Sequence, residues 1–189
     1  MINPAGERWE LQLKGAGKTP FSRFADGRAV LRSSIREFLC SEHMAALGVP
    51  TTRAGTLVVS DTMAVRDPSY SGRQILERCA IVSRIAPTLL RFGSWEVFKP
   101  LEGDRQGPLV GKGEELGKVM LEHVIKYHFP AIQQEFGEAR SEVKYLKFFE
   151  EVVVRTARMV ADWQLVGFTH GVLNTDNSNF LFLPLPFFS

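Results

Sequence analysis

The sequence predicts an α+β fold in two parts, and three observations support this. Alternation of apolar and polar residues, typical of β-strands, is concentrated in residues 1–100. Apolar residues three and four apart, which indicate amphipathic helices, dominate the C-terminal part. The stretch between them, 101–113, contains four glycines and a proline and is typical of a linker. We therefore expect a partial sheet-containing lobe over 1–100 and a partial helical lobe over 114–189.

The first part is expected to contain a strand, a helix and three further strands. The strand covers residues 8–13 and ends before Gly15 and Gly17, which favour a turn. The helix covers 34–47 and stops at Gly48. The later strands are expected at 56–60, 63–66 and 79–85, with a hairpin about Ser60 and Asp61 joining the first two.

The second part is expected to contain two helices, 114–129 and 141–166. In the longer helix, apolar residues repeat at helical spacing with charges between them, so one face is apolar and the other polar. Gly167 is expected to end it. The apolar positions are Val143, Leu146, Phe149, Val153, Ala157, Val160 and Ala161.

Composition is that of a globular protein and excludes several classes of function. The 189 residues are 44% hydrophobic, enough to bury one large core or two smaller ones. A net charge of +2 is too small to favour nucleic acid or an anionic membrane as a partner. No apolar run approaches the roughly 18 residues of a membrane span. Cys40 and Cys79 lack the spacing of a metal site or an obvious pair, which favours a reducing compartment.

A basic, glycine-containing segment follows the first strand. Backbone N–H groups and fixed cations in such a loop can bind a polyphosphate, although a solvated basic loop fits equally well. Between Lys14 and Arg36 this segment carries six basic residues and a single acid, Asp26. Those basic residues are Lys14, Lys18, Arg23, Arg28, Arg32 and Arg36.

Lys14 and Glu37 form a more specific pattern. A strand lysine held by a helix glutamate positions an ammonium against nucleotide phosphates in kinases. The alternative is a capping box, in which Ser34 and Glu37 close the start of the helix. The spacing by itself favours the capping box.

Two arginines, Arg84 and Arg91, lie seven residues apart in the segment "SRIAPTLLRFG". A guanidinium can bind two phosphate oxygens at once, so both are candidates for phosphate binding if the chain turns between them. The alternative is a pair of surface arginines.

The segment "HGVLNTDN", residues 170–177, follows the long helix. Asp176 and Asn177 offer a carboxylate and an amide oxygen suited to a hard divalent cation, or to a polar turn. Val172 stands where a kinase loop carries its catalytic aspartate. The order of the elements favours a functional site over a polar turn. As in kinases, the chain has in succession a strand lysine, a helix glutamate, several strands, a linker, a long helix and a loop that begins with histidine.

Three segments together resemble the selenoprotein O family, also called YdiU-like. They are "ELQLKGAGKTPFSRFADGRAVLRSSIREFLCSE", "SRIAPTLLRFG" and "HGVLNTDN". The resemblance implies a protein-kinase-like two-lobed fold that binds ATP in a reversed orientation. It also implies transfer of AMP to hydroxyl side chains of protein substrates. It places eukaryotic members in mitochondria and bacterial ones in the cytoplasm.

The resemblance also implies roles for individual residues. Lys14 would contact phosphate and Glu37 would hold it, while Arg84 and Arg91 would bind the triphosphate. Asp176 would act as the catalytic acid or base, and Asn177 would bind Mg²⁺ or Mn²⁺. The loop over the nucleotide would contain Gly15, Gly17, Lys18, Asp26 and Gly27.

The sequence departs from the family pattern at both ends. The family carries a segment before the Lys14 strand, and a second metal-binding aspartate after the asparagine of the loop. Here no Asp or Glu follows Asp176, and residues 178–189 are mostly apolar. We therefore expect partial lobes and weak or absent AMP transfer by this chain. The alternatives are a noncatalytic ATP-binding module and, less favoured, a conventional kinase. The apolar tail is expected to pack on the long helix.

Overall fold

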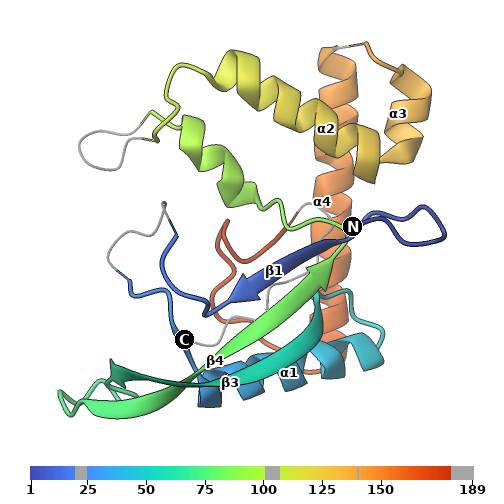
Figure 1. Ribbon diagram of the computed structural model, residues 1–189. Helices are drawn as coiled ribbons and strands as arrows, with labels where there is room; N and C mark the ends of the chain where they lie inside the picture. The colour runs from blue at the N-terminus through green and yellow to red at the C-terminus, as the bar shows by residue number, and fades with distance from the viewer. Residues whose placement is uncertain (20–24, 101–106, 140, 180–189) are drawn as a thin grey trace. The chain divides into compact units, whose positions relative to one another are not determined.

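The computed structural model describes residues 1–19, 25–100, 107–139 and 141–179. Within these ranges the fold is α+β, as predicted, with an antiparallel sheet and several helices (Figure 1). Residues 1–89 form one compact unit, and the described residues from 90 onward belong to a second. This division precedes the predicted linker at 101–113, of which residues 101–106 lie outside the described ranges.

The sheet of the first unit is built around β4 (Ile75–Ala86). β3 (Arg53–Arg66) pairs with one edge of β4. β1 (Glu10–Lys14) and β2 (Ala29–Val30) pair with the other edge, and every pairing is antiparallel. β4 therefore aligns the end of β1 with the start of the helix that follows β2.

The predicted hairpin about Ser60 and Asp61 is wrong, because 56–60 and 63–66 belong to the single strand β3. Val59 pairs with Ala80 and Met63 with Arg78, so three residues of β3 lie opposite one of β4. This irregularity resembles a bulge rather than a reversal of direction. Local turn chemistry at Ser60 and Asp61 is outweighed by continuous pairing with the long strand β4.

Helix α1 (Leu31–Ala46) packs on β3 and β4 of the sheet. A small core of Val30, Ala64 and Cys79 forms in this unit. Gly48 follows the helix with a positive φ of 80°, which agrees with the predicted stop. Cys40 and Cys79 are both free thiols.

The second unit is mostly helical, and its long helix is predicted correctly. α4 (Glu142–Leu165) begins at Ser141, whose hydroxyl accepts a hydrogen bond from the Lys144 N–H at 3.2 Å. The other predicted helix starts with one π-helical turn, Gly113–Gly117, and continues as α2 (Lys118–His128). The sequence analysis missed the short α3 (Pro130–Phe136) and the 3₁₀ segment η1 (Phe92–Phe98).

Aromatic and aliphatic side chains from these helices form the core of the second unit. Phe129 and Phe148 meet edge to face with their ring centroids 4.8 Å apart. Partly buried residues of η1, including Phe92 and Trp95, pack against this core. Its buried members are Val124, Ile125, Phe129, Ile132 and Phe148.

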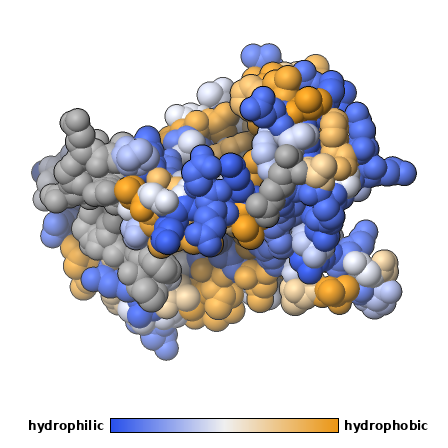
Figure 2. All heavy atoms as spheres, turned by 90° about the horizontal axis from the view of Figure 1, so that it is seen from above, coloured by the Kyte–Doolittle hydropathy of each residue, from blue (hydrophilic) through white to orange (hydrophobic). Residues whose placement is uncertain are grey.

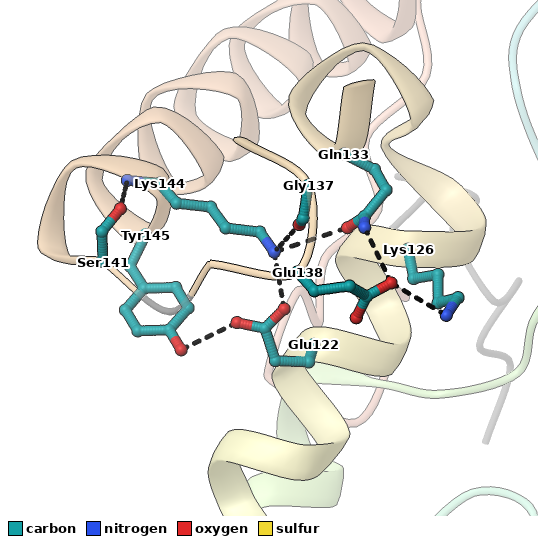
Figure 3. A network of polar contacts seen from close by, with 8 residues as sticks. All are labelled: Glu122, Lys126, Gln133, Gly137, Glu138, Ser141, Lys144 and Tyr145. Atoms are coloured by element: carbon teal, nitrogen blue, oxygen red, sulfur yellow. Dashed lines mark hydrogen bonds and ion pairs between the residues drawn. The ribbon is translucent and has the colours of Figure 1, made fainter. Parts of the chain in front are cut away.

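A fully buried lysine, Lys144, links α2, α3 and α4 (Figure 3). Its ammonium lies 2.6 Å from Glu122 Oε2 and donates to the Gly137 carbonyl at 2.9 Å and to Gln133 Oε1 at 3.4 Å. The second carboxylate oxygen of Glu122 accepts from the Tyr145 hydroxyl at 2.8 Å. The charge is thus buried with an acid partner and further acceptors, as a buried ammonium requires.

Apolar residues also reach the surface, in several patches between polar ones (Figure 2). Across the described ranges, each helix is too short or too polar to cross a bilayer. The predicted packing of the apolar tail falls on residues 180–189, which lie outside the described ranges.

Candidate functional site

In the first unit, Glu37 of α1 pairs with two cations from different strands. Its Oε2 contacts the ammonium of Lys14 at the end of β1, and its Oε1 lies 3.4 Å from a guanidinium nitrogen of Arg84 in β4. The side chains of Glu37 and Arg84 are 3% and 8% exposed, whereas that of Lys14 is 29% exposed. One carboxylate and two cations leave a net charge of +1, and the cation nearest to solvent is Lys14.

The capping-box interpretation of Ser34 and Glu37 is wrong. The helix starts at Leu31 with Val30 as its N-cap, so Ser34 is already inside the first turn. The Ser34 hydroxyl donates to the Val30 carbonyl at 2.9 Å instead. Because Glu37 lies beyond the first turn, its carboxylate is available for the ion pairs with the sheet.

Gln12 is a member of this cluster that the sequence analysis missed. A guanidinium nitrogen of Arg84 donates to Gln12 Oε1 at 2.5 Å. Gln12 lies in β1, two residues before Lys14. Residues two apart on a strand share a face, which is the signal by which Gln12 could be found once β1 is placed beside β4.

The glycine-containing loop is closed on itself where two of the predicted glycines meet. The Gly17 N–H donates to the Gly27 carbonyl at 3.0 Å, and both residues have positive φ, 113° and 70°. A Cβ at Gly15 would clash with the Ala80 carbonyl, and one at Gly27 with the backbone of Gly17. Lys18 is exposed at the edge of this loop, whose residues 20–24 lie outside the described ranges.

Asp26 is engaged by an arginine that the sequence analysis did not consider. Its carboxylate lies 2.8 Å from Arg66 of β3 and also accepts from the Arg28 N–H at 2.9 Å. The Arg66 guanidinium, followed by the Arg28 N–H, holds the pKa of Asp26 below its ordinary value. These contacts fasten the end of the loop to the sheet.

Because the pKa of Asp26 is lower in the folded protein, its contribution to stability is present at neutral pH. That contribution is lost as the pH falls below about 4 and through the folded-state pKa. With the Asp26 side chain 45% exposed, we expect Asp26→Asn to cost less than about 1 kcal/mol at pH 7 and to cost less at pH 3 than at pH 7. Urea midpoints at the two pH values measure the difference. An equal cost of Asp26→Asn at both pH values would contradict the assignment.

In the second unit, the loop of residues 170–177 is held by its own side chains. The Asn177 amide donates to the Val172 carbonyl at 2.6 Å, and the Asn174 side chain accepts from the Asp176 N–H at 3.1 Å. Asn177 is 3% exposed, whereas Asp176 is exposed. Because the side-chain NH₂ of Asn177 makes this hydrogen bond, its Oδ1 is the atom that could accept a bond from another group or bind a cation.

Segment η1 supports this loop from the side. The Gly93 N–H donates to the Thr175 carbonyl at 2.8 Å, and the Thr175 hydroxyl donates to Glu96 at 2.6 Å. A Cβ at Gly93 would meet the Asp176 carboxylate at 2.5 Å, so glycine allows η1 to approach the acid. The sequence analysis missed Gly93 and Glu96, since their pairing with the loop depends on tertiary structure.

Arg91 precedes η1, and His170 is the first residue of the loop. The Arg91 N–H donates to the Ser94 hydroxyl at 3.1 Å, while its backbone forms a bridge with Asn179. His170 stacks on Trp163 of α4 with 5.4 Å between the rings. Arg84 belongs to the first unit and Arg91 to the second. Their shared phosphate-binding role remains a prediction.

The observed cluster and loop define an α+β protein with a strand lysine held by a helix glutamate and a loop carrying adjacent Asp and Asn. A family model described as protein adenylyltransferase SelO matches residues 2–185. The chain therefore belongs to the SelO family, in agreement with the predicted resemblance.

Curated relatives from animals and bacteria extend this result. The chain is 56% identical to the mitochondrial protein adenylyltransferase SelO-1 of Danio rerio, over 98% of this chain and 26% of the relative. It is 55% identical to the mitochondrial protein adenylyltransferase SelO of Mus musculus, over 97% of this chain and 28% of the relative. It is 49% identical to the protein nucleotidyltransferase YdiU of Nitrosospira multiformis, over 99% of this chain and 31% of the relative. The chain spans about a quarter to a third of the length of these relatives.

Proposed function

We propose that this chain carries phosphate-binding and catalytic residues of a protein adenylyltransferase with a protein-kinase-like fold. It transfers AMP from ATP to hydroxyl side chains of proteins. The observation that supports this most is the cluster of Lys14, Glu37 and Arg84, in which one buried carboxylate pairs with two cations, and Lys14 is the more exposed of the two. The names of the relatives support the same reaction.

In this proposal the reaction is a displacement at the α-phosphorus of ATP. The substrate hydroxyl oxygen bonds to that phosphorus, the bond from it to the bridging oxygen of the β-phosphate breaks, and pyrophosphate leaves. Asp176 orients the hydroxyl and accepts its proton. Lys14, Arg84 and Arg91 offset the charge of the phosphates. Val172 has no group that accepts a proton, which disfavours the kinase reaction at the γ-phosphorus.

A divalent cation fits the residues of the loop. Asp176 and the Oδ1 of Asn177 are hard oxygen donors, and Mg²⁺ commonly takes one or two protein oxygens together with substrate phosphates and water. Among the described residues, His, Cys, Asp and Glu form no cluster of three or more that would hold a metal by itself. Bound there, Mg²⁺ or Mn²⁺ would neutralise phosphate charge. Asn177 would hold it through Oδ1, beside Asp176.

The glycine-containing loop has a supporting role. Gly15 and Gly27 allow the close backbone approach that shapes it, and Gly17 with Lys18 would face the phosphates. The ion pair of Asp26 with Arg66 positions the loop. We assign Asp26 this positioning role in place of direct nucleotide contact.

Labelled ATP distinguishes the proposed reaction from the alternatives. The full chain, incubated with Mg²⁺ or Mn²⁺ and a hydroxyl-bearing acceptor protein such as casein, is expected to incorporate label from α-labelled ATP only weakly, because no Asp or Glu follows Asp176 to act as a second metal ligand. It is not expected to incorporate label from γ-labelled ATP, because the γ-phosphate leaves with pyrophosphate. Gel autoradiography and mass spectrometry, with a mass increase of one AMP at Ser, Thr or Tyr, measure the outcome.

Three results would contradict the proposal. Incorporation from γ-labelled ATP would show a conventional kinase. A rise in melting temperature with ATP but no label would show a noncatalytic ATP-binding module. The absence of both label and a rise in melting temperature would show that the cluster of Lys14, Glu37 and Arg84 does not bind the nucleotide.

A further inference from the structure

Gln12 and Arg84 are cross-strand neighbours on one face of the sheet of the first unit. Gln12 of β1 lies directly opposite Arg84 in the antiparallel register of β1 and β4. Side chains of directly opposed residues stand on the same face and can interact. Leu11 and Leu13 are 53% and 57% exposed, whereas Gln12 and Lys14 are partly buried. The alternation of β1 therefore turns Gln12 and Lys14 toward the face on which Arg84 is buried.

The guanidinium of Arg84 is held from two elements, β1 and α1. One of its nitrogens donates to Gln12 Oε1 at 2.5 Å, and another lies 3.4 Å from Glu37 Oε1. The Arg84 side chain is 8% exposed, and a guanidinium so far removed from water needs acceptors for its N–H groups. On the β3 side the residue opposite Arg84 is Ala54, whose side chain has no acceptor. Of the two cross-strand neighbours, Gln12 is thus the one that supplies an acceptor.

The acceptor that Gln12 supplies carries no charge. Glu37 carries one negative charge against the two positive charges of Lys14 and Arg84, so these three ionised side chains have a net charge of +1. A carboxylate in place of the Gln12 amide would also accept from Arg84, but it would bring that net charge to zero. Because positive charge attracts a polyphosphate, the amide fixes the guanidinium without weakening the attraction.

We propose that Gln12 is a positioning residue of the phosphate-binding site. Its amide oxygen fixes the Arg84 guanidinium, and its lack of charge keeps the cluster of Lys14, Glu37 and Arg84 positive for the triphosphate. This inference rests on the proposed binding of ATP by that cluster. It adds a requirement that the ion pairs do not impose, namely that residue 12 accepts a hydrogen bond and is uncharged. A residue that served the fold alone would need only the first property.

Gln12→Glu separates these two properties. The carboxylate keeps an acceptor beside Arg84 and adds an opposite charge, so the melting temperature of the ligand-free chain should not fall. The affinity for ATP should fall at least about tenfold, because the cluster loses its net positive charge. Isothermal titration calorimetry of the full chain with ATP and Mg²⁺ measures the affinity, and thermal unfolding measures the stability.

Two further variants complete the comparison. Gln12→Met keeps the length of the side chain and removes the acceptor, so it should lower the melting temperature and weaken ATP binding about two- to tenfold. Gln74→Glu adds a charge at an exposed position before β4, up to about 33 Å from Arg84 along the strand. Since that distance exceeds the screening length, Gln74→Glu should leave the affinity within about twofold of wild type.

The outcomes separate this inference from the proposed function. Wild-type affinity in Gln12→Glu, or an equal loss in Gln74→Glu, would overturn the inference alone. A melting temperature that falls as far in Gln12→Glu as in Gln12→Met would also overturn it, because the side chain would not be acting as an acceptor. If ATP binds and the variants behave as expected but no AMP is transferred, the proposed function fails by itself. A wild-type chain that binds no ATP would overturn both.

Discussion

Replacing Asp176 by asparagine is expected to lower the rate of AMP transfer by roughly 10²- to 10⁴-fold, the usual contribution of a positioned general base. Asp176 is the acid of the loop, and its exposed side chain is free to meet a substrate hydroxyl. Asparagine keeps the shape but cannot accept the proton. Its effect on folding should be small, because the loop is held mainly by Asn174, Thr175 and Asn177. Initial rates with α-labelled ATP measure the loss.

A binding measurement separates the role of Asp176 in chemistry from a role in nucleotide affinity. Asp176→Asn should keep most of the rise in melting temperature that ATP and Mg²⁺ produce. Lys14→Ala should reduce that rise, because it removes the cation that Glu37 presents near solvent. If Asp176→Asn retains the wild-type rate, the proton acceptor is another group and the assignment is wrong.

Replacing Lys144 by alanine is expected to destabilise the second unit by about 3–5 kcal/mol, the range for removing one partner of a buried ion pair. The ammonium is 0% exposed and Glu122 16% exposed, so the remaining carboxylate stays largely desolvated. The Gly137 carbonyl loses its donor as well. Denaturant unfolding followed by circular dichroism gives the change in the free energy of unfolding.

Lys147→Ala is the matched control, since Lys147 lies on the same helix and pairs with Glu150. That pair is about half exposed on both sides, so its loss should cost far less than the loss of the Lys144 pair. Combining Lys144→Met with Glu122→Gln should recover much of the stability, because no uncompensated charge stays buried. Equal costs for Lys144→Ala and Lys147→Ala would refute the structural role of the network.

The parts of the fold that follow from local chemistry were predicted well. The repeat of apolar residues at helical spacing and the glycine at 167 define α4, because that pattern has a helical period over many turns. The hairpin at Ser60 and Asp61 was predicted wrongly because a polar dipeptide favours a turn locally. Pairing along β4 outweighs that preference, and no local pattern reports the partner strand.

The same division applies to the site. Short motifs identified Lys14, Glu37, Asp176 and Asn177, because their residue types and order indicate phosphate and metal chemistry whatever the surroundings. Spacing by itself favoured a helix cap for Glu37. The ion pairs with Lys14 and Arg84 became visible only when β1 and β4 were paired beside α1.

The sequence by itself determined the family, the long amphipathic helix and the candidate residues for binding phosphate or metal. These depend on residue identity and on periodicity over neighbouring positions. Tertiary structure alone decided which residues meet. It places Glu37 against cations of two strands and pairs Asp26 with Arg66. It also brings η1 against the loop of residues 170–177 and buries Lys144 among three helices. The physical reason is that burial and pairing depend on segments far apart in the chain, whereas propensity and charge belong to each residue where it stands.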